Sequence, residues 1–152
     1  MPYFHVVFTL PAPLAPLAFQ HKRLLCGMLF RAAARTLRTI ARDPQHLGAD
    51  IGVLAVLHTW GQTLQRHPHL HCVVPGGGLA PEGTHWIPCR PQFFLPVRVL
   101  SRYFRRTFLT LLRAAYRQGK LQCRGPLAPL ADPPLWHRWI EQLDRVEWVV
   151  YA

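Results

Sequence analysis

The sequence predicts a single α+β domain, spanning residues 1–152, with a mainly antiparallel sheet and flanking helices. The predicted elements follow one another as a strand, a helix, a hairpin, a second helix and a final strand near the C-terminus, an order that is typical of that class. A length of 152 residues suits one domain with one core. Half of the residues are hydrophobic and only 16% are charged, a composition that excludes a disordered chain.

The first half of the chain contains three strand candidates and one helix candidate. Residues 3–10 (YFHVVFTL) are rich in aromatic and β-branched side chains, which indicates a buried strand. Residues 20–42 lack proline and repeat apolar side chains at helical spacing, so we expect a helix of about six turns. The apolar runs at 51–60 and 69–75 flank a short polar stretch and predict a hairpin, which the glycines at 76–78 end.

The second half is expected to add two helices and to complete the sheet. A short strand is predicted at 84–87, followed by a long helix at 97–120. Residues 121–135 are rich in proline and leucine and are expected to form a loop. A short helix at 136–143 and a strand at 146–151 then end the chain.

The charge of the chain points to a polyanionic partner. Eighteen Lys and Arg residues against seven Asp and Glu give a formal net charge of +11. Fold stability does not require such an imbalance, whereas nucleic acid attracts it, so nucleic acid is the leading partner class.

Cysteine spacing and hydropathy exclude several other classes of protein. The four cysteines form no CxxC pair, which argues against a zinc finger and a disulfide scaffold and favours free thiols in a reducing cytosol: Cys26, Cys72, Cys89 and Cys123. No apolar run approaches the roughly 20 residues that span a bilayer, so no membrane partner is expected.

The densest chemical signal is the run HPHLH at residues 67–71. If residues 69–74 form a strand, His69 and His71 lie on one face about 7 Å apart along the backbone, while Leu70 and Cys72 point into the core. Two imidazoles can then converge on one ion. The alternative is that both histidines are ordinary surface or hydrogen-bonded strand residues.

A third ligand would come from the neighbouring strand of the hairpin. A turn centred between residues 65 and 66 sets Gln62 opposite His69 and His58 opposite Val73, so either Gln62 or His58 could complete the site. A shift of one residue in the pairing of the two strands would turn these candidate ligands to the other face of the sheet. A closed structural zinc site would need a fourth strong ligand from elsewhere.

Basic side chains form stripes on both predicted long helices. Helix 98–120 has no acidic residue, and seven cations fall within an arc of about 120°: Arg98, Arg102, Arg105, Arg106, Arg113, Arg117 and Lys120. The first helix carries a shorter stripe: Arg31, Arg35, Arg38 and Arg42. A solvated face normally mixes both signs of charge, so the stripes favour phosphate contact over a merely solvated surface.

Taken together, these blocks resemble the catalytic domain of the two-tyrosine HUH transposases of bacterial rolling-circle insertion sequences. The resemblance covers nearly the whole chain, and the GGG after the histidine strand makes it specific. Its blocks are PYFHVVFTLP at 2–11, LHTWGQ at 57–62, HPHLHCVVPGGGL at 67–79, LPVRVLSRYFR at 95–105 and WVVYA at 148–152.

The resemblance implies a fold, a cofactor and a reaction. The fold is the HUH ferredoxin-like domain, in which His69 and His71 hold Mg²⁺ or Mn²⁺ and Gln62 is the candidate third ligand. Such enzymes cut single-stranded DNA at transposon ends by attack of a tyrosine, leaving a 5′-phosphotyrosine and a free 3′-OH. Tyrosine is a weak nucleophile with a pKa near 10, so a cation that polarises the phosphate suits the reaction.

The sequence departs from the family pattern in two ways. The family has a cysteine-rich zinc-binding segment before the first strand, where this sequence begins. Its tyrosine pair follows the WVVYA block, where this sequence ends, and none of the four tyrosines present forms such a pair: Tyr3, Tyr103, Tyr116 and Tyr151. We therefore expect a truncated domain that binds DNA and metal and has no catalytic nucleophile of its own.

Three hypotheses follow for the chain. The first is this fragment, located in the bacterial cytoplasm with the nucleoid and able to self-associate through an exposed C-terminal strand at 146–151. The second is a complete nickase with a single tyrosine, either Tyr103 or Tyr116. The third is a non-catalytic nucleic-acid-binding module with an RRM-like sheet, which would not bind metal.

Overall fold

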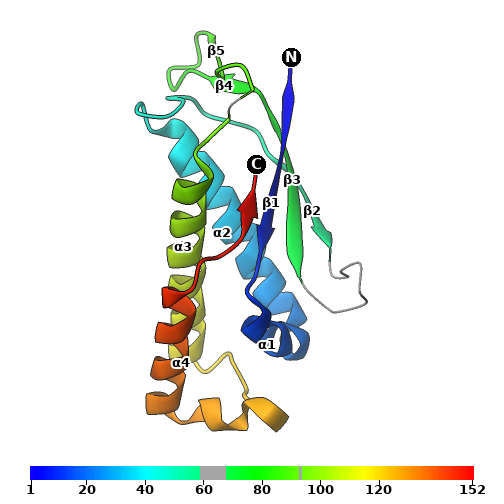
Figure 1. Ribbon diagram of the computed structural model, residues 1–152, viewed down its shortest axis with the longest axis vertical. Coiled ribbons are helices and arrows are strands. Elements are labelled where there is room, and N and C mark those ends of the chain that lie inside the picture. Colours follow the sequence, from blue (N-terminus) through cyan, green and yellow to red (C-terminus); the bar gives the residue numbers. More distant parts are fainter. Residues whose placement is uncertain (59–67, 93) are drawn as a thin grey trace.

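A computed structural model, which describes residues 1–58, 68–92 and 94–152, has a four-stranded antiparallel sheet beside two long helices (Figure 1). The sheet order is β2-β3-β1-β6, with β1 at Tyr3–Thr9, β2 at Leu54–His58, β3 at His69–Pro75 and β6 at Val150–Tyr151. Helix α2 (Lys22–Arg42) connects β1 to β2, and α3 (Val97–Arg117) follows β3. This β-α-β-β-α-β order confirms the predicted α+β, ferredoxin-like class.

The chain also has a second, smaller sheet and several short helices. A second, two-stranded sheet pairs β4 with β5 next to the C-terminal end of β3. The short elements are η1 (Ala12–Leu14), α1 (Ala15–Gln20), β4 (Gly77–Leu79), β5 (Trp86–Pro88), η2 (Gly125–Ala131) and α4 (Pro133–Arg145). No described helix is long and apolar enough to cross a membrane.

The two faces of the main sheet have opposite character because side chains alternate along each strand. Val6 and Phe8 of β1 and Leu70 and Cys72 of β3 are all buried. The Phe8 ring lies 4.8 Å from that of Phe104 on α3, so this face packs against the helices. The opposite face has no helix over it among the described residues and is the face that presents the histidines.

Trp148 anchors the C-terminal segment in the core. Its side chain is fully buried against Phe104 and Phe108, and its indole N–H donates a hydrogen bond to the carbonyl of Leu143. The strand predicted at 146–151 is therefore shorter than expected: only Val150–Tyr151 pairs with β1.

The three glycines after β3 are required by close backbone contacts. A Cβ on Gly76 would lie 2.6 Å from the Pro2 ring, and one on Gly78 would lie 2.6 Å from the carbonyl oxygen of Asp50. At Gly77 it would lie 2.5 Å from the carbonyl oxygen of Ile87. The glycines do end β3, as expected, but they also begin β4 of the second sheet.

The bounds of two predicted helices differ from those observed. The helix expected at 20–42 is α2, which begins at Lys22 because the backbone of His21 lies outside the helical region (φ −127°, ψ 55°). The short helix α1, which the sequence did not predict, precedes it. Pro16 lies in the first turn of α1, where a missing N–H costs no hydrogen bond. For the same reason α4 begins at Pro133, three residues earlier than predicted, and takes up the end of the expected loop at 121–135.

The register of the hairpin also differs from the prediction. His58 lies opposite His69 and not opposite Val73, a shift of four residues (73 − 69). A shift of the strand register by an even number of residues leaves each side chain on the same face of the sheet. The alternation of apolar residues therefore predicts which residues share a face, but not which residue of the other strand each one pairs with. Gln62, expected opposite His69, lies outside the described residues.

The aromatic cluster beneath the sheet should dominate the stability of the fold. Phe104 is fully buried against Phe8, Phe108 and Trp148, so Phe104→Ala should lower the free energy of unfolding by about 3–5 kcal/mol, as measured by urea denaturation. Phe30→Ala is the control, because Phe30 is 37% exposed and should cost much less. Equal losses would show that this cluster is not the centre of the core.

Candidate functional site

A group of histidines lies on the open face of the sheet. His69 and His71 are on β3, and His58, at the end of β2, pairs directly with His69. Cβ atoms of directly opposed residues are about 4.5–5.5 Å apart and those of diagonal neighbours about 7–8 Å, so long side chains from both strands can meet. Sheet register therefore brings together three imidazoles that are up to 13 residues apart in sequence (71 − 58).

The three histidines form a potential metal centre. One ring nitrogen from each of His58, His69 and His71 lies within 4.8 Å of the others. Ring centroids are 5.0 Å apart for His58 and His69, 5.5 Å for His58 and His71, and 5.0 Å for His69 and His71. The structure thus brings together both predicted ligands and His58, the second of the two candidates for the third ligand.

His71 is in the chemical state that a metal ligand needs. Burial lowers the pKa of its imidazole, and its three histidine neighbours lower it further. The neutral ring, which has a free lone pair, is thus favoured. Its Nε2 atom is buried and has no hydrogen-bond partner among the described residues, although a buried polar atom normally has one. An ion would supply the missing partner, so these residues fit a metal.

The electrostatics of the histidine cluster favour an anionic fourth ligand. None of the seven Asp and Glu residues lies on β1, β2 or β3. Three neutral imidazoles leave the +2 charge of a bound cation uncompensated, and an open coordination position can then accept a phosphate oxygen. Cys72 cannot take that position, because burial raises the pKa of its thiol to about 12 and it faces the helices.

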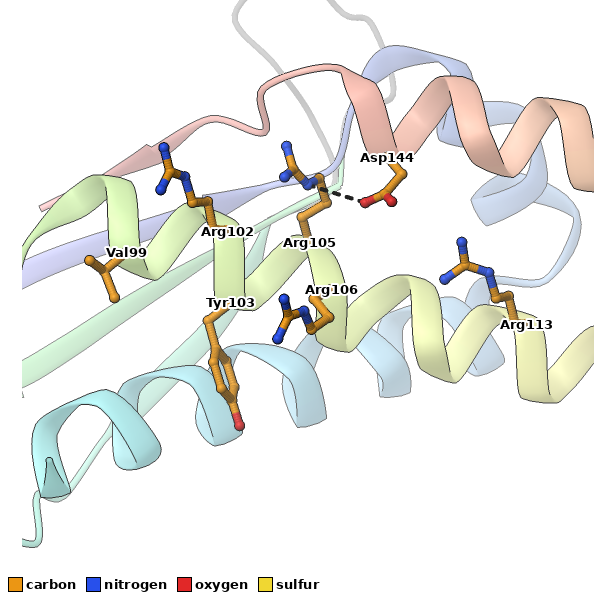
Figure 2. Close-up of a pocket in the computed structure, with 7 residues that line it drawn as sticks. All are labelled: Val99, Arg102, Tyr103, Arg105, Arg106, Arg113 and Asp144. Atoms are coloured by element: carbon orange, nitrogen blue, oxygen red, sulfur yellow. Dashed lines mark ion pairs between the residues drawn. The ribbon is translucent and has the colours of Figure 1, made fainter.

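The arginine stripe of α3 lines a separate surface. An open hollow of about 560 Å³ lies along α3, with one lining residue from α4. Figure 2 shows the side chains that line it. Its lining residues are Val99, Arg102, Tyr103, Arg105, Arg106, Arg113 and Asp144. Arg105 is held there by Asp144, at 3.4 Å from Nε, and by the carbonyl of Val146, at 3.0 Å from Nη1. Its role is therefore at least partly structural.

The remaining predicted DNA-binding cations are divided between α2 and the rest of α3. Arg31, Arg35, Arg38 and Arg42 line a second hollow of about 430 Å³ on α2, where Arg42 lies 3.6 Å from Asp50. Arg98, Arg117 and Lys120 are exposed near the two ends of α3. Since α2 and α3 cover the buried face of the sheet, both stripes lie on the other side of the sheet from the histidines.

The helix layer also holds two of the four tyrosines. The Tyr103 hydroxyl donates to Thr39 Oγ1 on α2 at 3.4 Å. The Tyr116 hydroxyl lies 3.1 Å from the carbonyl oxygen of Leu130, and its ring stacks on Trp136 at 4.1 Å. Both hydroxyls therefore make contacts within the helix layer, and the absence of a nucleophile stays a prediction.

Comparison with known proteins places the chain in a family. Residues 52–152 match the Y2_Tnp family model, whose description reads "Putative transposase". The chain belongs to the Y2_Tnp transposase family. This transposase chain is 61% identical over 150 residues to "Putative transposase y4qJ" of Sinorhizobium fredii (strain NBRC 101917 / NGR234), covering 99% of the chain and 38% of the relative.

Two further similarities agree with the family and the fold. The "Transposase for insertion sequence element IS801" of Pseudomonas savastanoi pv. phaseolicola is 44% identical over 83 residues, which cover 55% of the chain and 19% of that protein. The conjugative relaxase TrwC, in a complex with mutant OriT DNA, superposes with a TM-score of 0.53 at 17% identity, covering 78% of the chain and 45% of the relaxase. The family model and the two relatives confirm the predicted transposase family, and the relaxase superposition confirms the predicted α+β fold. The chain spans less than half of each of these three proteins.

One further histidine, which the sequence did not predict, lies next to the histidine cluster. His5 on β1 lies 2.8 Å from His71, between His5 Nε2 and His71 Nδ1. It is 66 residues away in sequence, so only the pairing of β1 with β3 brings the two together. The sequence held a signal for it, because His5 is the only histidine in the mostly apolar run of residues 3–10.

The histidine cluster should bind a divalent cation in solution. Replacing His69 and His71 together by alanine should abolish Mn²⁺ binding measured by calorimetry, because two of the three ligand atoms are then missing. His58→Ala should weaken the binding. The control is His85→Ala, since His85 is exposed on the β4–β5 connection. Wild-type heats no larger than those of the double variant would contradict the assignment.

Proposed function

We propose that this chain is the metal- and DNA-binding part of a transposase that nicks and joins DNA strands through a tyrosine during rolling-circle transposition. The observation that carries the proposal is the cluster of His58, His69 and His71 on the open sheet face of a chain from the transposase family. A putative transposase and an insertion-sequence transposase are similar in sequence, and a relaxase with a similar fold has been seen with DNA.

Residues His58, His69 and His71 would hold the cation. Gln62, which the sequence predicts as the third ligand, lies outside the described residues. A divalent ion in this position would polarise the scissile phosphate and offset the charge that develops on its oxygens. Imidazole nitrogens suit borderline ions, whereas Mg²⁺ prefers an all-oxygen shell. Of the two ions predicted, Mn²⁺ is therefore the better match for a site built from three histidines.

The open sheet face suits single-stranded DNA better than a duplex. Apolar and aromatic side chains on it are between 39% and 66% exposed: Tyr3, Leu54, Val56, Val73 and Tyr151. Unpaired bases can stack on such side chains, whereas the bases of a duplex are already stacked on each other. Tyr151 lies in the same cross-strand row as His71, with Val7 between them. A base stacked there would bring its phosphate close to the histidines.

The arginine surfaces would bind a second stretch of DNA. The stripes on α2 and α3 lie across the sheet from the histidines, so they cannot contact the same phosphate. They are positioned to hold flanking DNA that passes around the domain, and their cations would neutralise phosphates irrespective of base sequence.

Salt dependence measures the number of phosphates that the α3 stripe neutralises. For single-stranded DNA, log K should fall linearly with log salt at about 0.7 per phosphate, so Arg102, Arg106 and Arg113 changed together to Gln should lower the slope by about 2. The matched control changes Arg23, Arg90 and Arg138, which are exposed elsewhere, to Gln. If both triple variants lower the slope equally, only net charge matters and the stripe is not a binding surface.

The chain by itself should not form a covalent bond to DNA. Tyr103 and Tyr116 are engaged in the helix layer, and loss of a nucleophile removes several orders of magnitude of rate. Incubation with labelled single-stranded oligonucleotides from rolling-circle element ends and Mn²⁺ should give no adduct that survives denaturation.

Tyrosine variants show what an unexpected adduct would mean. An adduct lost in Tyr151→Phe would make the chain a single-tyrosine nickase, because Tyr151 shares the histidine face. Tyr3→Phe is the matched control on the same face, four residues from Val7 along β1. Loss of the adduct in Tyr103→Phe or Tyr116→Phe would point to the helix layer instead.

A further inference from the structure

His5 and His71 are joined by a hydrogen bond across the β1–β3 pair. His5 Nε2 lies 2.8 Å from His71 Nδ1. The two rings are 17° from parallel with centroids 5.0 Å apart, the separation of imidazoles joined edge to edge through a bond of this length. The bond therefore lies close to both ring planes, where the lone pair of one ring nitrogen meets the N–H of the other.

This bond leaves one nitrogen of His71 for another partner. His71 Nδ1 is used by His5, whereas His71 Nε2 is buried and has no hydrogen-bond partner among the described residues. A neutral imidazole carries one proton. If that proton is on Nδ1 and is donated to His5, then Nε2 has a free lone pair with which it can bind a cation.

We propose that His5 is a positioning residue that fixes the Nδ1–H tautomer and the ring orientation of His71, so that His71 Nε2 is the atom that ligates a divalent cation. The proposal rests on the metal site of the proposed function and adds a fourth histidine, from β1, that supports the three around the ion. A histidine that ligates a metal almost always donates its second N–H to a hydrogen-bond acceptor, which is usually a carboxylate, a backbone carbonyl or water. Loss of that acceptor typically weakens metal binding 10- to 100-fold.

The placement of His5 distinguishes this role from that of a fourth ligand. Its Nε2 atom is used in the bond to His71. Among the described residues, the group whose ligand atoms lie within one 4.8 Å shell contains His58, His69 and His71 but not His5. With its own proton on Nδ1, His5 accepts at Nε2 and holds the His71 ring through Nδ1, which leaves Nε2 of His71 for a cation.

Long-range ¹⁵N NMR of the metal-free protein tests the tautomer directly. Wild type should show His71 with its proton on Nδ1, and His5→Ala should show a mixture of the two tautomers. Gln can accept the same hydrogen bond through its side-chain carbonyl, so His5→Gln should restore the single tautomer. A mixed tautomer or an Nε2–H tautomer in the wild type would overturn the proposal, whether or not the protein binds metal.

Calorimetry with Mn²⁺ tests the consequence for binding. His5→Ala should bind about 10- to 100-fold more weakly than wild type, His5→Gln should recover most of the affinity, and His85→Ala should match wild type. Unchanged affinity in His5→Ala would overturn the positioning role. So would a loss as complete as that of His71→Ala with no recovery in His5→Gln, because His5 would then be a ligand. Absence of Mn²⁺ binding by wild type, with the Nδ1–H tautomer intact, would refute the proposed function and leave the His5–His71 contact as a structural bond.

Discussion

The pairing of β1 with β3, in a register that sends alternate side chains to opposite faces, is the constraint on which the rest of the structure depends. On one face this pairing aligns Val6, Phe8, Leu70 and Cys72 beneath the helices. On the other it places His5 next to His71. A slip by one residue would bury the imidazoles and expose the aromatic core, so the hydrophobic effect that holds the fold together also holds the site in place.

The two sides of the domain separate two kinds of chemistry. The three described strands that carry the histidines have no carboxylate side chain, so a cation bound there would keep its charge for a phosphate. The helix side carries fixed positive charge on α2 and α3, partly balanced by Asp50 and Asp144. Because the sheet and its core lie between them, each side can be altered with little effect on the other, as expected for independent sites.

The geometry of the histidine site depends on residues that are not themselves candidate ligands. His71 is positioned by a residue on β1, and β1 is held by Phe8 against Phe104 and, on its outer edge, by β6. Trp148 fixes the segment before β6 in the core. The C-terminal block WVVYA therefore completes the sheet beside the site, which explains how a segment far from the histidines in sequence contributes to their geometry.

The sequence by itself determined the order of the main strands and helices, the shared face of His69 and His71, and the family, because alternating burial and specific motifs are local properties. It also indicated that His58 was within reach. Only the tertiary structure decided that His58 lies opposite His69, that His5 bonds to His71, and that the arginine stripes lie across the sheet from the histidines. Periodicity fixes the face of a side chain but cannot distinguish registers that differ by an even number of residues. Nor does it specify which strand, far away in sequence, will be the neighbour.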